Sequence, residues 1–269
     1  MRKPVFLSIP AAKLKNHFHY VRRGKLNLEI QLDWNSLENH ESFIFDELKM
    51  ERDNHGMELT LHAPFIDMAP GAADPKMREA TQARLKQTAE LAEELGAKGI
   101  VVHPGWEERR YLNDNDGYVS RCVETWGLLL DQTEKCGCGI ALENIYEKNP
   151  ELLARVIEKV NSPRFGNCFD AGHFNVFSEI SLDNWLDVMG RYITHLHLHN
   201  NYGKTDEHNG MKSGTFNFEK LFDALPPNGR SPILALEPHT ENGVDESLEH
   251  LMELGMLDSV NNQRELKAV

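Results

Sequence analysis

The sequence predicts a single (β/α)8 barrel domain spanning residues 1–269, and three observations support this fold class. Short, mostly apolar runs alternate with amphipathic helical stretches along the chain, which is the pattern of a parallel sheet covered by helices. Eight such runs occur, the number of strands in this barrel. No glycine-rich dinucleotide fingerprint follows the first run, and its absence disfavours an open doubly wound sheet.

The predicted strands are short and apolar on both faces, as strands buried between a barrel interior and a helical layer should be. They are Val5–Ile9, Leu26–Leu32, Glu58–His62, Gly99–His103, Gly139–Glu143, Phe165–Asp170, Tyr192–His199 and Pro232–Glu237. The clearest predicted helix is Asp74–Gly96, which begins with an Asp cap followed by proline and ends at a glycine. Further helices are predicted at Ser36–Asn54, Gly117–Gly137, Asn149–Val160, Ser181–Met189, Asn217–Ala224 and Val244–Leu254.

The composition is that of a folded domain without a membrane partner. Hydrophobic residues make up 40% and charged residues 26% of the chain, and no run of 18 apolar residues occurs. The apolar patch near the N-terminus is too short for a signal peptide and is interpreted as the first strand. The net charge of −13 argues against a broad phosphate-binding surface, so nucleic acid is not expected as a partner. The four cysteines are interpreted as reduced thiols of a cytoplasmic protein, since the lone C-x-C lacks a partner pair.

Polar residues end six consecutive predicted strands, from the third to the eighth. In such a barrel the carboxyl ends of the strands meet at one face, where catalytic groups lie. Converging carboxylates repel one another, and divalent cations remove this conflict because they neutralise carboxylates and bind imidazole nitrogen. A mixed nitrogen and oxygen donor set without thiolate favours Zn, Mn, Fe or Co over Ca. The residues are His62, His103, Glu143, Asp170 with nearby His173, His197, and Glu237 with nearby His239.

The stretch "HLHLHNNYGKTDEH" gathers four histidines around the end of the seventh predicted strand. His195, His197 and His199 alternate with leucine, so they share one face of the strand. We expect His197 to point into the barrel mouth and His195 to be a buried core histidine. His199 is placed to be a ligand, a substrate contact or a donor to a ligand. Asp206 and His208 follow in a polar loop, where both could reach one ion.

Seven short motifs stand in an order that resembles one known family. They are "LHAPF", "VVHPG", "ALEN", "FDAGH", "HLHLHNN", "DEH" and "LEPH", and they cover most of the chain from His62 to Glu237. In this they resemble the xylose isomerase-like barrels, which include endonuclease IV, sugar isomerases and epimerases. The resemblance implies a metal-dependent enzyme.

Two kinds of metal site occur in that family, and the resemblance implies ligands for each. The keto-sugar epimerase type holds one metal through four ligands, which correspond here to Glu143, Asp170, His197 and Glu237. The endonuclease IV type holds three metals and adds positions corresponding to His62, His103, His173, Asp206 and His208. The chain carries all nine residues. By this resemblance Glu143 would bridge two ions, and Asp206 with His208 would hold the third. We therefore expect one to three divalent ions per chain, Zn or Mn.

Two positions depart from the family pattern. Lys212 stands where a glycine is more usual, and Asn200 stands where an acid usually follows the histidines of the seventh strand. Both positions touch the expected substrate rim, so they bear on the substrate more than on the metal.

Three functions remain open from the sequence. The first is a sugar or sugar-phosphate isomerase or epimerase, in which Glu143 and Glu237 exchange a proton beside a carbonyl that a metal polarises. The second is a phosphoester hydrolase with a two- or three-metal cluster, and the third is a non-catalytic metal-binding barrel. The acidity and compact loops favour a small carbohydrate-like substrate, which places the first ahead. Candidate substrate contacts are Trp106, Arg109, His199, Lys204 and Lys212.

Overall fold

The computed structural model describes residues 5–24, 26–40, 44–111, 113–225 and 231–257. In this part of the chain eight parallel strands close into a barrel in sequence order, which confirms the predicted fold class. The strands are β1 (Val5–Pro10), β2 (Asn27–Gln31), β3 (Leu59–His62), β4 (Gly99–Val102), β5 (Gly139–Glu143), β6 (Phe165–Asp170), β7 (Ile193–Leu198) and β8 (Ile233–Leu236). The bounds of each strand lie close to the bounds predicted for it.

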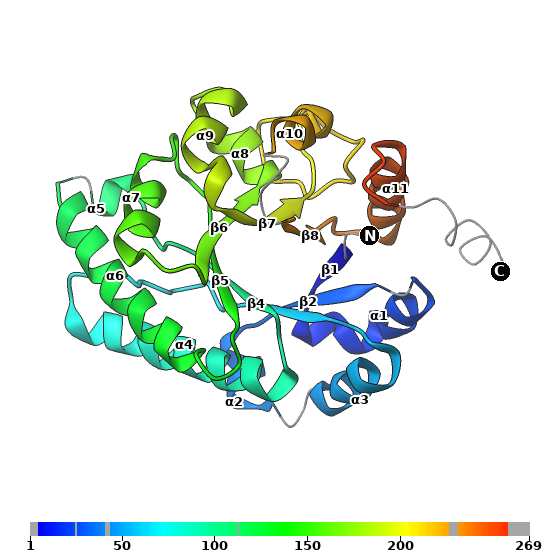
Figure 1. Ribbon diagram of the computed structural model, residues 1–269, viewed down its shortest axis with the longest axis horizontal. Coiled ribbons are helices and arrows are strands. Elements are labelled where there is room, and N and C mark those ends of the chain that lie inside the picture. The colour runs from blue at the N-terminus through cyan, green and yellow to red at the C-terminus, as the bar shows by residue number, and fades with distance from the viewer. Residues whose placement is uncertain (1–4, 25, 41–43, 112, 226–230, 258–269) are drawn as a thin grey trace.

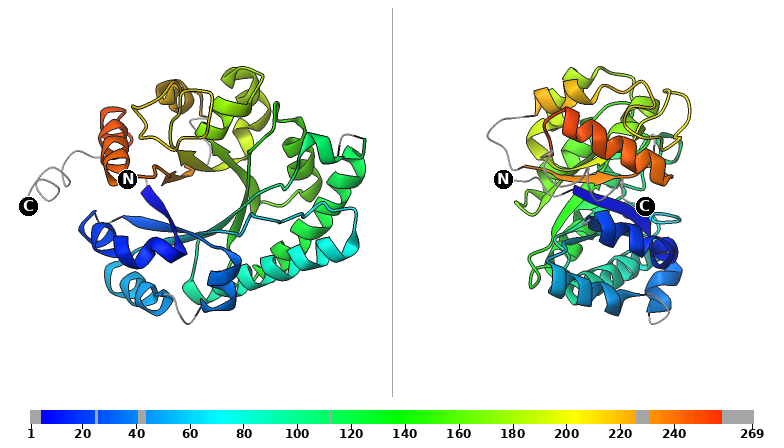
Figure 2. Two further views of the ribbon diagram at one scale, coloured as in Figure 1. Left: turned by 180° about the vertical axis from the view of Figure 1, so that it is seen from behind. Right: turned by 90° about the vertical axis from the view of Figure 1, so that its right-hand side faces the viewer.

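Helices surround the barrel, as Figures 1 and 2 show. They are α1 (Ala11–Gly24), α2 (Trp34–Glu38), α3 (Phe45–His55), α4 (Pro75–Leu95), α5 (Glu108–Tyr111), α6 (Asn115–Gln132), α7 (Glu151–Val160), α8 (Ala171–Phe177), α9 (Leu182–Met189), the 3-10 turn η2 (Gly190–Tyr192), α10 (Phe218–Ala224) and α11 (Glu241–Glu253). No helix in the described ranges is both long enough and apolar enough to cross a bilayer.

The best-predicted helix follows its local signals closely. The carboxylate of Asp74 accepts a hydrogen bond from the backbone N–H of Lys76, Pro75 occupies the first turn, and Gly96 ends α4 with φ +62°. The single helix predicted over Ser36–Asn54 is wrong, because α2 and α3 are separate. Residues 41–43 of that range lie outside the described residues. Asn39 and His40, at the end of α2, are weak helix formers.

The barrel strands bury both apolar and polar side chains. Val101, Ala141 and Cys168 form a small apolar cluster of their own, separate from the large core between strands and helices. Glu29 is also fully buried, although it lies in β2 between Leu28 and Ile30. The strand register brings Asp170 level with His197. Polar side chains from neighbouring strands therefore meet inside the barrel rather than being spread over its surface.

All four cysteines are free, and three of them are buried. Burial raises the pKa of the Cys122 thiol to about 12. The pKa of Cys138 is likewise raised by burial. Burial therefore keeps the thiols of Cys122 and Cys138 protonated at neutral pH.

Candidate metal centre

The residues predicted at the strand ends converge beside one cavity of about 1250 Å³. Seven of the nine predicted ligands line it: His62, His103, Glu143, His173, Asp206, His208 and Glu237. The other two, Asp170 and His197, are completely buried and contact members of this group. Neighbouring strands therefore bring all nine side chains to one place.

Glu143, at the end of β5, stands at the middle of the cluster. Its Oε2 atom lies 3.1 Å from Nε2 of His62 and 3.1 Å from Nε2 of His103. The two imidazole nitrogens are themselves 3.2 Å apart. The Oε1 atom lies 3.2 Å from Nδ1 of His197 and 3.2 Å from Nδ1 of His173. Only 1% of this side chain is exposed, so these imidazoles replace water around the carboxylate.

His62, His103 and Glu143 form the first donor set, and their spacing fits a cation. Zinc binds nitrogen and oxygen ligands at about 2.0–2.1 Å, which places tetrahedral neighbours roughly 3.3 Å apart. The three donor atoms are separated by 3.1–3.2 Å. At these distances one cation could be bound by the two imidazole nitrogens and the carboxylate oxygen together.

The second donor set consists of Glu143, Asp170, His197 and Glu237. Nδ1 of His197 lies 3.2 Å from Glu143 Oε1, 3.5 Å from Asp170 Oδ2 and 3.5 Å from Glu237 Oε2. Three carboxylates, none more than 5% exposed, thus surround one ring nitrogen. Without a cation, this concentration of buried negative charge would be costly.

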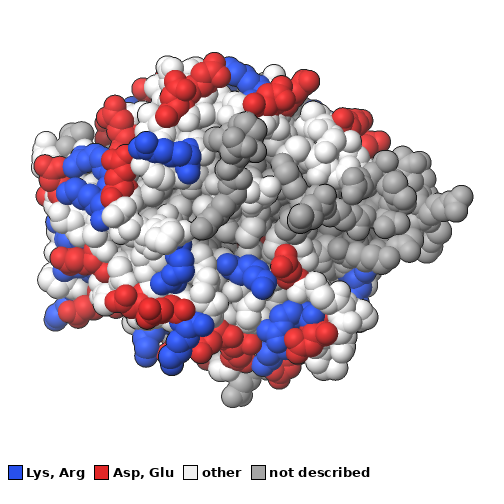
Figure 3. Space-filling model, viewed as in Figure 1, with Lys and Arg blue, Asp and Glu red and all other residues white. Residues whose placement is uncertain are grey.

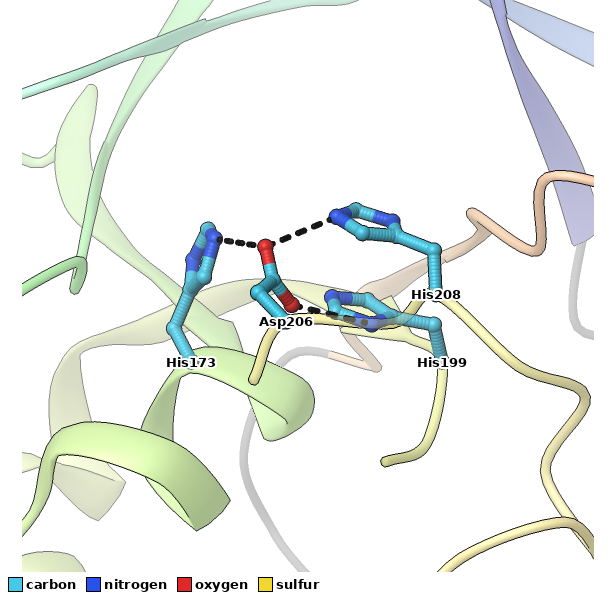
Figure 4. Close-up of side chains that lie close together, drawn as sticks. All are labelled: His173, His199, Asp206 and His208. Atoms are coloured by element: carbon cyan, nitrogen blue, oxygen red, sulfur yellow. Dashed lines mark hydrogen bonds and ion pairs between the residues drawn. The ribbon is translucent and has the colours of Figure 1, made fainter. Parts of the chain in front are cut away.

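The third donor set, His173, Asp206 and His208, lies nearer the surface. Asp206 Oδ2 is 3.3 Å from Nε2 of His173 and 3.0 Å from Nε2 of His208. Figure 4 shows the carboxylate between the two rings. His173 comes from the first turn of α8, whereas the other two residues lie on the loop after β7.

Three imidazoles of these sets are held by backbone carbonyls in the tautomer that metal ligation requires. Because a backbone carbonyl can only accept, Nδ1 donates to Ala63 in His62 (3.0 Å), to Asn144 in His173 (3.1 Å) and to Glu237 in His208 (3.0 Å). In each ring Nε2 then faces the carboxylate cluster, where its lone pair would be available to a bound cation. Such outer contacts orient metal-binding histidines generally.

Glu29 supports the second donor set, and sequence analysis missed it. Its Oε1 lies 2.9 Å from Nε2 of His197, and the hydroxyls of Ser8 and Thr60 donate to its two oxygens at 3.2 Å. Burial alone would raise the pKa of Glu29, but the adjacent positive charge of His197 outweighs it and holds the pKa at about 2. The available signal was a charged residue inside an otherwise apolar strand.

The ligand carboxylates themselves remain ionised. Burial alone would raise the pKa values of Glu143 and Asp170, yet the surrounding imidazoles hold both well below their usual ranges. Burial alone would lower the pKa of His208, but its pairing with Asp206 exceeds that cost and raises the pKa to about 9. Ionised carboxylates with an attraction for positive charge are what a cation site needs.

The predicted substrate contacts divide into two groups. Trp106 and Arg109 line the cavity, whereas Lys204 and Lys212 do not. The ammonium group of Lys212 pairs instead with Glu249 and Glu253 on α11. Lys204 lies exposed on the loop that carries Asp206.

His199 also differs from a substrate contact. Its side chain is fully buried, and Nε2 donates to Asp170 at 3.0–3.1 Å. It therefore orients a carboxylate of the second donor set, and its Nδ1 lies 3.7 Å from Oδ1 of Asp206 in the third set. His195 is buried, and burial lowers its pKa to about 4, so it is the neutral core histidine that was predicted.

Asn200, where the family more often has an acid, holds the loop together. Its amide nitrogen donates to the carbonyl of Met211 at 2.7 Å, and its amide oxygen accepts from the backbone N–H of Phe216 at 3.0 Å. Its backbone also forms a bridge with Asn209. A carboxylate could not donate to Met211, so the amide closes the loop in a way that an acid cannot.

Two solved structures resemble the whole barrel. A "D-tagatose 3-epimerase-like protein" superposes with a TM-score of 0.81 at 24% identity, covering 93% of this chain and 96% of that one. The TTHB071 protein from Thermus thermophilus, in a structure soaked with ZnCl2, superposes with a TM-score of 0.80 at 27% identity, covering 93% and 97%. The first similarity concerns the fold alone, and the second is to a zinc-soaked structure.

A curated relative is similar over part of its length. The "Probable endonuclease 4" of Symbiobacterium thermophilum is 31% identical over 143 residues, which span 50% of this chain and 50% of that protein. The sequence profile of the family described as "Xylose isomerase-like TIM barrel" matches residues 24–254. This chain therefore belongs to the xylose isomerase-like TIM barrel family.

Proposed function

We propose that this chain is a divalent-metal-dependent enzyme whose centre holds more than one cation, and that it hydrolyses a small phosphoester. The observation that carries the proposal is the position of Glu143. Its Oε2 faces His62 and His103, while its Oε1 faces His197. A carboxylate shared between two donor sets suits a bridge between two cations, and paired cations are a recurrent arrangement for phosphoester hydrolysis.

This proposal reverses the order that the sequence alone suggested. Proton exchange beside a carbonyl needs only the second donor set, and it leaves the first and third sets without a role. When bound, divalent cations in the three sets would stabilise charge on phosphoryl oxygens and lower the pKa of an attacking water. Hydrolysis therefore accounts for all nine convergent side chains.

The chain's own residues would bind and orient the phosphoester. Arg109, Arg110 and Lys148 line the same cavity as the donor sets. Guanidinium and ammonium groups can pair with phosphate oxygens, and Lys148 would exchange its ion pairs with Glu108 and Glu179 for such a contact. Phe65 and Trp106 add apolar wall, which can exclude water around a leaving group. The cavity volume of about 1250 Å³ suits a small molecule.

The surface charge favours a small phosphoester over a long nucleic acid. The net charge is −13, and on the face shown in Figure 3 lysine and arginine are interspersed with aspartate and glutamate. A nucleic-acid surface would present a continuous basic strip, because affinity for phosphate backbones depends on such contacts.

Sugar epimerisation is the second candidate, and a specific observation supports it. Glu143 and Glu237 both approach Nδ1 of His197, at 3.2 and 3.5 Å. Two carboxylates beside one cation could exchange a proton on either face of a keto-sugar. Glu237 Oε1 accepts a hydrogen bond from Gln31 at 3.2 Å, which would hold that carboxylate in place.

Metal analysis and a substrate screen test the proposal together. Two or three cations per purified chain, with hydrolysis of bis(p-nitrophenyl) phosphate, would support it. One cation with epimerisation of D-tagatose or D-fructose would replace it with the second candidate. Cleavage of an oligonucleotide with an abasic site would contradict the restriction to small substrates. Glu143→Gln should abolish either activity, whereas the matched surface variant Glu158→Gln should retain it.

A further inference from the structure

Three imidazole rings stack in parallel beside the third donor set. The ring of His208 lies between those of His199 and His239, with centroid distances of 3.8 and 4.2 Å. The planes differ by only 2° and 3°. Figure 4 shows the inner half of this arrangement, where His208 lies over His199. The ligand ring is therefore sandwiched between two rings that are not among the nine predicted ligands.

His208 needs such support because its backbone is strained. Its φ is +50°, in the left-handed region that residues with a Cβ seldom adopt. It lies on a loop rather than on a strand. Two hydrogen bonds of 3.0 Å tie His208 to the chain after β8. Nδ1 of His208 donates to the carbonyl of Glu237, and the backbone N–H of His239 donates to the carbonyl of His208. The first bond orients the ring, the second places the backbone, and the flanking rings cover the two faces of the side chain.

The inner ring of the stack is built into the core. His199 is fully buried, and a Cβ at Gly172 would collide with its ring. Gly172 therefore leaves the room that the ring occupies. Since Nε2 of His199 donates to Asp170, the inner ring is held independently of His208.

The outer ring is the accessible part of the stack. His239 is exposed and lines the cavity of the metal centre. It covers the face of the His208 ring that His199 leaves open. Asp206, the carboxylate of the same donor set, is 28% exposed, so little else encloses this part of the site.

We propose that His199 and His239 act as an imidazole clamp on His208, and that the outer member, His239, sets how tightly the third donor set retains its cation. The proposal rests on the proposed function in that it requires cations to bind. Its physical basis is preorganisation. A ligand ring held in the correct plane loses less freedom on binding. Hydrogen-bonded partners that orient metal-binding histidines change metal affinity by about 10- to 100-fold, and we expect an effect of the same order from stacking.

The clamp is tested by cation retention rather than by turnover. Zinc-loaded protein is dialysed against increasing dipicolinate, and zinc per chain is measured by mass spectrometry. We expect His239→Ala to lose one cation per chain at a dipicolinate concentration about 10- to 100-fold lower than the native protein requires. His239→Phe keeps a flat ring without ring nitrogens and should behave like the native protein. His55→Ala, an exposed histidine on α3, is the matched control.

The outcomes separate the clamp from the proposed function. If His239→Ala retains every cation as the native protein does, the clamp is wrong and the metal centre stands. If His239→Phe loses zinc as readily as His239→Ala, a ring nitrogen rather than stacking is responsible, and the clamp is again wrong. A native protein that binds no cation would overturn both proposals.

Discussion

The second and third donor sets are built from similar residues but are held in different ways. The second set lies at or beside the ends of barrel strands, and Glu143, Asp170 and His197 are at most 1% exposed. The third set depends on a loop, where Asp206 is 28% and His208 is 13% exposed. Barrel register places the second donor set, whereas local hydrogen bonds and ring stacking place the third. We infer that the second set is the permanent part of the centre and the third the adjustable part.

The loop of the third set is itself tied to a distant helix. The N–H of Lys212 donates to Glu246 at 2.7 Å, the hydroxyl of Ser213 donates to the same carboxylate at 2.8 Å, and the N–H of Met211 donates to Ser247 at 3.0 Å. Both acceptors lie on α11. The position of Asp206 and His208 therefore depends on packing at the far end of the sequence.

The largest expected effect comes from Glu143→Gln, which removes the carboxylate shared by the first and second sets. We expect the cations of the first and second sets to be lost, leaving at most the one cation of the third set, and turnover to fall by about 10³-fold or more, since charge stabilisation is lost at the centre of the site. Zinc per chain and hydrolysis rate measure this, with circular dichroism to verify the fold. Retention of all cations by this folded variant would show that Glu143 is not the bridge.

Asp206→Asn should remove only the third cation, because an amide cannot supply the charged oxygen ligand that would bind this cation together with His173 and His208. We expect one cation fewer per chain and a rate lower by roughly 10- to 100-fold. Metal analysis after dialysis distinguishes this from the previous variant. Should Asp206→Asn empty the whole centre, the two sets would not be independent, and the contrast between them would be lost.

Glu29→Gln tests whether support beneath the second set matters as much as the ligands. The amide keeps contacts with Ser8 and Thr60 but weakens the orientation of His197. We expect an affinity lower by about 10- to 100-fold for the cation of the second set, with the third set unaffected. Chelator competition measures the affinity, and Glu79→Gln on the exposed face of α4 is the control. Equal retention by both variants would limit Glu29 to a packing role.

The same division explains what the sequence could predict. Strand ends converge in any such barrel, so reading the last polar residue of each strand was enough to bring His62, Glu143 and Glu237 together. Glu29 was not predicted as part of the site because it is not at a strand end, although Leu28 and Ile30 on either side indicate that it is buried. The periodicity of neighbouring residues describes a strand well and says little about which acid will lie beneath a histidine of another strand.

Loops were harder, because their paths depend on partners far away in the sequence. Lys212 was expected at the substrate rim, but its partners Glu249 and Glu253 lie on a helix about 40 residues later. His199 shares a strand face with His197, yet whether it reaches substrate depends on the space left by Gly172 on another element. No local pattern contains that information.

Glu147 is a buried acid outside all three donor sets, and it provides the smallest expected effect. Its Oε2 accepts from the N–H of Ile145 at 2.7 Å, while its Oε1 is buried without a hydrogen-bond partner among the described residues. Burial raises the pKa of Glu147 from 4.5 to about 7, whereas imidazoles hold the pKa of Glu143 well below its usual range. A carboxyl group whose pKa is raised by folding contributes stability that is complete below about pH 4.5 and is lost as the pH rises through 7.

Replacing this group should therefore change the pH dependence of stability without changing the metal centre. Glu147→Gln stays neutral at every pH and can still accept from Ile145, so it should be more stable than the native protein above pH 7. The raised pKa of Glu147 corresponds to a difference in the free energy of unfolding of at most on the order of 3 kcal/mol. Below about pH 5 the two proteins should have the same Tm, because the native carboxyl group is then protonated. Thermal unfolding of cation-free protein between pH 5 and pH 8.5 measures the difference, and a constant gap in Tm across that range would show that Glu147 does not titrate there. Zinc content of the variant should equal that of the native protein, since Glu147 belongs to none of the three donor sets.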